Sequence, residues 1–170
     1  MPSFRGSFLH TLDEKNRLSI PAKYRKSSNS TSHDIFIITV GLDRCLFVYP
    51  QDIWENEVER ELNKLSFTTG DHRLFARKLL HHATDVQLDR QGRLTLPQKL
   101  LDIAEIKKEV LIKGMLTRLE FWNPETYEKY ESGSPKSLEE VAENIRWGSQ
   151  TQVYPPASFN NPGGEPPNNQ

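Results

Sequence analysis

The sequence is poor in the residues that several classes of protein require. It contains one cysteine among 170 residues, and this residue, Cys45, lies in an apolar stretch, so a disulfide scaffold and a thiolate zinc site are excluded. No apolar run approaches the ~20 residues of a membrane span, and the opening of the chain has no apolar signal-peptide core. These absences predict a protein of the reducing cytoplasm with no membrane partner.

Net charge is also nearly absent, but the charges are unevenly placed. The formal net charge is −1, hydrophobic residues make up 35% of the chain, and charged residues make up 26%. This composition is typical of a globular protein with modest cores, which often gains stability by intertwining repeats or by oligomerising. Residues 1–30 contain six basic and two acidic residues, a net charge of +4. One end of a nearly neutral chain therefore offers phosphate groups a basic surface.

Two segments of the chain repeat one pattern. Residues 12–21 read LDEKNRLSIP, and residues 88–97 read LDRQGRLTLP. Five of the ten positions are identical, and the Ser/Thr and Ile/Leu differences keep the character of the side chain. A second match follows in the same order, because GLDRCLFVYP at residues 41–50 resembles GMLTRLEFWNP at residues 114–124. Two ordered matches indicate an internal repeat.

The repeat suggests two units, at about residues 1–80 and 81–147. The second match places Phe47 opposite Phe121 in the alignment, at an offset slightly shorter than that of the first match. Residues 148–170 are rich in proline, asparagine and glycine and nearly free of charge. Such a composition predicts a flexible or partner-dependent tail.

Each unit is predicted to contain two pairs of strands followed by helices. FRGSFLHTL alternates apolar and other residues, whereas DIFIITV, CLFVYP, EVLIKG and LEFWNP are short apolar runs typical of buried strands. The expected class is mainly β with short helices, an α+β fold.

Three helices are expected outside the strands. PQDIWENEVERELNKL has an amphipathic stripe, GDHRLFARKLLHH begins with Asp71 as its expected N-cap, and SLEEVAENIRW begins with a capping box formed by Ser137 and Glu140. The residues expected to face inward are Trp54, Val58, Leu62 and Leu65 in the first helix, Leu74, Phe75 and Leu79 in the second, and Leu138, Val141 and Ile145 in the third.

The repeated Asp-x-x-x-Arg segment is predicted to be a tight turn. Asp13 and Asp89 begin the two copies, and such aspartates accept hydrogen bonds from the amides of a turn. Asn16 and Gly92 occupy the fourth position, where the two residue types that most readily adopt positive φ would be selected. Turn chemistry thus accounts for the aspartates and for the fourth position without any ligand.

The arginines that end the two turns, Arg17 and Arg93, have two interpretations. In the first, each forms a surface ion pair with the aspartate four positions earlier, worth ~0–1 kcal/mol, and fixes a hairpin. In the second, each contacts phosphates or the O6/N7 edge of guanine. Both can hold, because an aspartate that orients an arginine also preorganises it.

FRGSFLHTLDEKNRLSIPAKYR resembles the opening of the MraZ family, transcriptional regulators from the head of the bacterial division and cell-wall gene cluster. LDRQGRLTLP, EVLIKG and LEFWNPETY resemble the second unit of that family, so the resemblance covers roughly residues 3–147. It implies an AbrB-like (SpoVT-AbrB) swapped-hairpin fold, in which two tandem units form a pseudo-dimer with short helices packed outside. It also implies a ring-shaped homo-oligomer that binds direct repeats in the promoter of its own operon, usually as a repressor.

Carried over by position, the resemblance implies a set of residues that bind double-stranded promoter DNA. These are Arg5, Lys15, Arg17, Lys23, Arg90 and Arg93. Asn16 stands where the family more usually has glycine, and Gln91 stands at the position of Lys15 in the first copy. The second copy is therefore less basic at its tip, and Arg17 is expected to contribute more than Arg93. A nucleoid-associated protein of the cytoplasm is expected.

Other chemistry has weaker support in the sequence. His81 and His82 adjoin Asp85, but adjacent side chains on a helix point ~100° apart, which is poor geometry for one metal ion. Cys45 is interpreted as a core residue rather than a nucleophile. No catalytic triad or phosphate-binding glycine loop stands out, so neither an enzyme nor a cofactor, metal or small-molecule site is expected. The alternative function is a scaffold or antitoxin-like module that uses the same fold to bind a protein.

Overall fold

A computed structural model of the chain describes residues 3–25 and 34–145. The chain forms two compact units, Met1–Gly133 and Ser134–Gln170. The tail predicted for residues 148–170 lies outside the described residues. Among the helices that are described, none is both long enough and apolar enough to cross a membrane.

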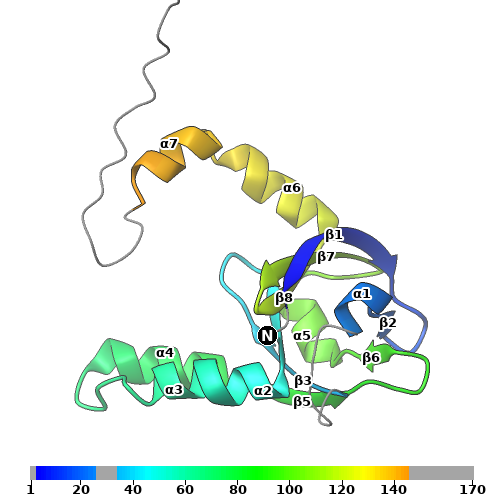
Figure 1. Cartoon of the computed structure of the whole chain (residues 1–170), viewed down its shortest axis with the longest axis horizontal. Helices are drawn as coiled ribbons and strands as arrows, with labels where there is room; N and C mark the ends of the chain where they lie inside the picture. The colour runs from blue at the N-terminus through cyan, green and yellow to red at the C-terminus, as the bar shows by residue number, and fades with distance from the viewer. Residues whose placement is uncertain (1–2, 26–33, 146–170) are drawn as a thin grey trace, which may run out of the picture. The chain divides into compact units, whose positions relative to one another are not determined.

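The first unit is built on two antiparallel sheets (Figure 1). The larger has the strand order β1-β7-β8-β4-β3-β5, and the smaller is the ribbon β2-β6. The strands are β1 (Phe4–Thr11), β2 (Arg17–Ser19), β3 (Ile35–Val40), β4 (Leu46–Pro50), β5 (Thr84–Gln87), β6 (Arg93–Thr95), β7 (Glu109–Leu116) and β8 (Arg118–Trp122). With short helices around these sheets, the predicted α+β class is confirmed.

The two repeats exchange strands. β1 pairs with β7, and β5 pairs with β3, so the opening strand of each repeat lies beside a strand of the other. The pairs β2–β6 and β4–β8 also join the two repeats. The pseudo-dimer of swapped hairpins implied by the resemblance is therefore confirmed. The turn between β1 and β2 joins two strands that pair elsewhere, and the local hairpin suggested by the sequence does not form.

The strand register corrects the alignment of the second match. Ile38 and Ile112 are equivalent, because they pair with Thr84 and Phe8, which are themselves 76 residues apart. Across the next strand Ile38 pairs with Val48, whereas Ile112 pairs with Phe121. Phe121 is thus the counterpart of Val48, and its alignment with Phe47 was wrong by one residue. The cause is the tighter turn between β7 and β8, which the sequence match did not place.

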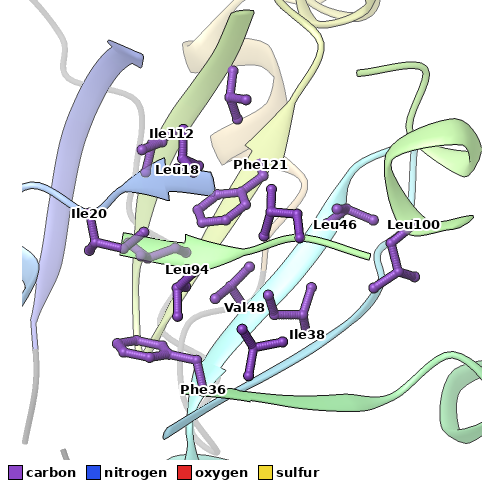
Figure 2. Close-up of a cluster of buried hydrophobic side chains, with 14 of the residues drawn as sticks. Leu18, Ile20, Phe36, Ile38, Leu46, Val48, Leu94, Leu100, Ile112 and Phe121 are labelled. Atoms are coloured by element: carbon purple, nitrogen blue, oxygen red, sulfur yellow. The ribbon is translucent and has the colours of Figure 1, made fainter. Parts of the chain in front are cut away.

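The main core lies between one face of the larger sheet and the ribbon β2–β6 (Figure 2). Leu18 and Leu94 face each other at the centre of the ribbon, and neither has any exposed surface. The helices α1 (Ala22–Arg25) and α5 (Gln98–Ile103) add Tyr24, Leu100 and Leu101 to this core. Both repeats contribute residues throughout, so the core exists only when both are folded.

A second layer of helices follows β4. The first predicted helix is one continuous run of α2 (Gln51–Ile53), a π-helical segment η1 (Trp54–Val58) and α3 (Glu59–Leu62). Trp54 is buried as expected, but Val58, Leu62 and Leu65 are only partly buried. The π segment rotates the positions that follow it, and a regular 3.6-residue period cannot anticipate that rotation.

The helix α4 (Gly70–His81) begins two residues earlier than predicted. Its N-cap is Thr69, whereas Asp71 lies within the first turn. Leu74 and Phe75 were expected to face inward, but they are 51% and 48% exposed, and only Leu79 is partly covered. Helical periodicity identified the helix but assigned its buried face wrongly, because little of the chain packs against it.

The last described helices are α6 (Pro124–Gly133), in the first unit, and α7 (Leu138–Glu143), in the second. The capping box at the start of α7 is confirmed, because the Glu140 N–H donates to Ser137 Oγ and the Ser137 N–H donates to Glu140 Oε2. The expected burial was wrong. The three residues expected to face inward are all exposed, namely Leu138 and Val141 in the helix and Ile145 just after it.

Candidate nucleic-acid interface

The first Asp-x-x-x-Arg turn is closed by its aspartate. Asp13 Oδ1 accepts hydrogen bonds of 2.9 Å from the backbone N–H groups of Lys15 and Arg17. Arg17 Nε donates to Asp13 Oδ2 at 2.6 Å. Asn16 has φ of 56°, and its N–H donates to the Asp13 carbonyl at 3.0 Å. One carboxylate therefore shapes the turn and also holds the arginine that ends it.

The second turn repeats this geometry. Asp89 Oδ1 accepts from the N–H groups of Gln91 at 2.8 Å and of Arg93 at 3.0 Å, and Arg93 Nε donates to Asp89 Oδ2 at 2.7 Å. Gly92 has φ of 74° and donates its N–H to the Asp89 carbonyl at 2.9 Å. The roles predicted for both aspartates and for both fourth positions as turn residues agree with this geometry.

Each turn is tied to the other repeat. The carbonyl of Asn16 accepts from the N–H of Leu96 at 2.9 Å, and the carbonyl of Gly92 accepts from the N–H of Ile20 at 3.0 Å. These bonds extend the ribbon at both ends. Two residues with positive φ thus direct their carbonyl groups into the partner strand, so the turns and the ribbon form one structure.

Both aspartates are held in the ionised form. The hydrogen bond from the Arg17 backbone is the largest influence on Asp13 and, with the Arg17 side chain, lowers the pKa of this carboxyl group despite partial desolvation. Desolvation is the largest influence on Asp89 and raises its pKa, but the hydrogen bonds from Arg93 and Gln91 outweigh it, so the net pKa is lowered. Each arginine of the motif therefore has a carboxylate partner at neutral pH.

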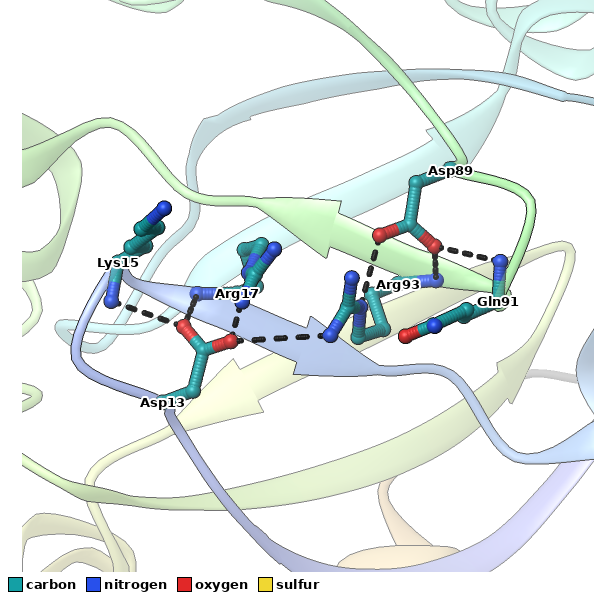
Figure 3. Close-up of polar contacts among 6 residues, drawn as sticks. All are labelled: Asp13, Lys15, Arg17, Asp89, Gln91 and Arg93. Atoms are coloured by element: carbon teal, nitrogen blue, oxygen red, sulfur yellow. Dashed lines mark hydrogen bonds and ion pairs between the residues drawn. The ribbon is translucent and has the colours of Figure 1, made fainter.

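The outer face of the ribbon carries two arginines and two hydroxyl groups. Arg17 pairs with Thr95, and Ser19 pairs with Arg93. Because the two central leucines point into the core and side chains alternate along a strand, these four side chains share the opposite face. Both arginines lie on this ribbon between the two turns (Figure 3). The face has approximate two-fold symmetry, although a single chain forms it.

The duplicated sequence pattern has a counterpart among known protein families. The model of one family, described as "MraZ protein, putative antitoxin-like", matches the chain twice, over residues 3–78 and 79–145. The chain belongs to the MraZ family. A relative from Desulforamulus reducens, named "Transcriptional regulator MraZ", is 44% identical over 142 residues, which cover 84% of this chain and 96% of the relative. Relatives of the same name from Syntrophomonas wolfei and Moorella thermoacetica are 43% and 42% identical, with the same coverage.

In this MraZ chain, the two arginines are not equivalent. Arg93 also approaches the aspartate of the other turn, with Nη1 3.9 Å from Asp13 Oδ2. The side chain of Arg93 is 23% exposed, whereas that of Arg17 is 31% exposed. No reciprocal ion pair joins Arg17 to Asp89 among the described residues. Arg17 is therefore the more accessible of the two cations.

The other predicted DNA-binding residues fall into two places. Lys15 and Arg90 are exposed at the tips of the turns, and in the described parts of the chain neither forms an ion pair. Lys23 lies near the start of β1, where its Nζ donates to the Arg5 carbonyl at 3.2 Å. The Arg5 side chain is exposed. Arg5 and Lys23 thus form one group at the start of β1, and the other four residues form a second group on the two turns and the ribbon.

Three residues that neighbour the turns or the start of β1 were given no role in the sequence analysis. Tyr24 is buried and donates its hydroxyl to the carbonyl groups of Arg5 and Gly6, at 2.9 and 3.1 Å. Gln98 accepts from Asn16 Nδ2 at 2.9 Å. Arg25 packs against Gly92. These contacts join segments far apart in sequence, and of the three residues only Arg25 left a signal, as part of the basic charge of residues 1–30.

The remaining candidate residues are the adjacent histidines His81 and His82 and the single cysteine, Cys45. The rings of His81 and His82 pack edge to face, with centroids 4.7 Å apart. Among residues 3–25 and 34–145, no group of three His, Cys, Asp or Glu side chains is placed to hold a metal ion. Cys45 is buried, and burial, followed by the negative charges of Glu120 and Asp43, raises the pKa of its thiol to about 12. The thiol is therefore protonated, and its interpretation as a core residue is confirmed.

Proposed function

We propose that the chain is a transcriptional regulator that binds double-stranded DNA in the promoter of its own operon, in the division and cell-wall gene cluster. It acts there as a repressor and as a ring-shaped homo-oligomer. Membership of the MraZ family and the names of the relatives support the regulatory role. A DNA-bound protein of this kind is located at the nucleoid.

The outer face of the ribbon is the observation that carries the proposal. A two-stranded antiparallel ribbon fits into the major groove of B-DNA, and arginine forms paired hydrogen bonds to guanine O6 and N7. Arg17 and Arg93 lie on such a ribbon with Ser19 and Thr95 beside them. Asp13 and Asp89 fix the direction of the two guanidinium groups before DNA arrives. Preorganisation lowers the entropic cost of forming specific contacts.

The cations at the periphery supply the electrostatic part of binding. Because an aspartate offsets the charge of each ribbon arginine, attraction to phosphates depends on Lys15 and Arg90 at the tips and on Arg5 and Lys23 beyond them. A unit that neutralises ~4–6 phosphates loses affinity steeply as salt rises. A ring offers several such units to several direct repeats, which raises the apparent affinity through effective concentration. Repeats about 10 base pairs apart would place the units on one side of the DNA.

A mobility-shift experiment with a duplex from upstream of the gene tests this proposal. Arg17→Ala is expected to abolish the shift, while gel filtration still shows the assembly of the unchanged protein. Arg60→Ala is the matched control, because Arg60 is exposed on α3 and takes part in no ion pair among the described residues. Equal binding by Arg17→Ala and the unchanged protein would show that the arginine assignment is wrong.

The alternative function is a scaffold or antitoxin-like protein-binding module. The description of the MraZ family includes the term antitoxin-like. If the unchanged protein binds no upstream DNA at low salt, the regulatory proposal fails and this alternative gains support.

A further inference from the structure

The second turn receives a guanidinium group from the first repeat. Arg25 ends α1, and its side chain lies directly on Gly92. A Cβ atom at position 92 would lie 2.5 Å from Arg25 Nη1, 2.6 Å from Cδ and 2.7 Å from Cζ. Real Cβ atoms do not come this close to other groups. Glycine at this position therefore allows the positive φ and also leaves the space that Arg25 occupies.

Two hydrogen bonds fix this arrangement. Arg25 Nε donates to the Ile20 carbonyl at 3.0 Å. The N–H of the same Ile20 donates to the Gly92 carbonyl at 3.0 Å. One residue at the end of the ribbon thus holds both the turn and the arginine. Among the described residues, no hydrogen-bond partner competes with a ligand for the Nη groups of Arg25.

Within residues 3–25 and 34–145, no comparable cation packs on the first turn. At the position corresponding to Gly92 stands Asn16, whose side chain contacts the neutral Gln98. At the repeat offset of 76 the counterpart of Arg25 is Leu101, which is buried in the core. The two turns have the same backbone geometry but different neighbours, and this difference breaks the two-fold symmetry of the surface.

No carboxylate in the described part of the chain offsets the charge of Arg25. Arg17 and Arg93 each have an aspartate partner, whereas Arg25 forms no ion pair with a described carboxylate. Residues 13–17 contain two acidic and two basic side chains, and residues 89–93 contain one acidic and two basic side chains. With Arg25 beside it, the second turn is the more positive of the two. The comparison of Gln91 with Lys15 alone predicted the opposite, that the second turn would be the less basic of the two.

We propose that Arg25 is a DNA-contacting residue of the second turn, where its Nη groups bind a backbone phosphate beside Arg93. The inference rests on the proposed function, because it assumes that the turns face DNA. In this arrangement Arg17 is the main cation at one end of the ribbon, and Arg25 takes that part at the other end. A guanidinium group binds phosphate through two parallel hydrogen bonds, and its attachment to Ile20 preorganises it for this contact.

The test is the salt dependence of binding to a fluorescent duplex from upstream of the gene, followed by anisotropy with the full chain. Arg25→Gln is expected to weaken binding about threefold to tenfold at moderate salt and to reduce the slope of log affinity against log salt by ~0.9, the share of one phosphate. Arg25→Lys keeps the charge and is expected to keep most of the slope. Arg60→Gln, with the same change of charge on α3, is expected to match the unchanged protein.

The outcomes separate this inference from the proposed function. If the unchanged protein binds but Arg25→Gln has the same affinity and slope, Arg25 does not contact DNA and only the inference fails. If Arg25→Gln and Arg25→Lys lose affinity equally with an unchanged slope, Arg25 merely supports the turn, and the inference fails again. If the unchanged protein does not bind the duplex even at low salt, the proposed function itself fails. Circular dichroism and gel filtration of each variant confirm that it is folded and assembled.

Discussion

At the scale of single residues, the aspartate of each motif has two structural roles. Its carboxylate accepts backbone N–H groups and so determines the turn, and it also accepts from the arginine that the turn presents. The geometry that a structural ion pair requires is therefore the same geometry that would orient the arginine toward DNA in the proposed complex. A structural ion pair and a binding residue are not competing interpretations at these positions.

The first prediction concerns the pH dependence of this pairing. The pKa of Asp13 is lowered in the folded chain, so its contribution to stability is present above its usual pKa and is lost as the pH falls through the lowered value, below about pH 4. Asp13→Asn should destabilise the protein at neutral pH, and the difference from the unchanged protein should shrink as the pH falls through this range. Urea denaturation at a series of pH values measures it.

Asp85→Asn is the matched control, because Asp85 is exposed on β5 and is paired with no described cation. It should show a smaller difference at every pH. If the cost of Asp13→Asn stayed constant down to the lowest pH, the ionised carboxylate would not be what stabilises the turn.

At the scale of elements, the exchange of strands makes the ribbon a joint product of the two repeats. The alternation in FRGSFLHTL and the apolar runs that follow were sufficient to locate the strands, because burial of one or both faces leaves a pattern in the sequence. The pattern does not identify the partner strand, since β1 would bury the same residues against β2 or β7. The resemblance to a swapped-hairpin family supplied that information.

Other elements show which contacts such sequence patterns can predict and which they cannot. The two turns were predictable because the hydrogen bonds that close them join residues at most four positions apart. The contact between Arg25 and Gly92 could not be predicted, because it depends on how α1 of the first repeat packs against the second turn. Helical periodicity likewise located α4 but could not reveal that Leu74 and Phe75 lack a partner in the first unit.

The second prediction tests the ribbon as a packed element. Leu94→Ala removes a fully buried side chain at its centre and should lower the free energy of unfolding by about 3–5 kcal/mol. Leu9→Ala, on the exposed face of β1, is the control and should cost less than about 0.5 kcal/mol. Denaturation at one fixed protein concentration measures both, because the proposed oligomerisation would also contribute to stability. Equal costs would mean that the ribbon does not pack on the core as described.

At the scale of the whole molecule, several apolar side chains are exposed to solvent in the single chain. Leu74 and Phe75 on α4 are about half exposed, and this helix also carries Arg73, Arg77 and Lys78. Exposed apolar residues of this kind are typical of protein interfaces. A surface that meets a different surface on a neighbouring copy produces a closed ring when the rotation between copies closes, which fits the proposed assembly.

The third prediction therefore concerns assembly. Leu74→Asp should convert the proposed ring into smaller species, observed by light scattering coupled to gel filtration, without unfolding the chain. Leu42→Asp is the control, because Leu42 is also exposed but lies in the loop between β3 and β4. A ring of unchanged mass with Leu74→Asp would exclude this part of α4 from the interface. DNA binding by single units should persist with lower apparent affinity, since only the effective concentration is lost.

Protection of guanine N7 from methylation in upstream DNA tests the central claim most directly, because N7 lies in the major groove at the position where an arginine would bind. The unchanged protein should protect guanines in evenly spaced direct repeats about 10 base pairs apart. Arg17→Ala, at a concentration that restores occupancy, should remove the protection at the guanine that Arg17 contacts in each repeat. Occupied DNA with no protected guanine, or protection that persists unchanged in Arg17→Ala, would contradict the claim that this ribbon reads the major groove.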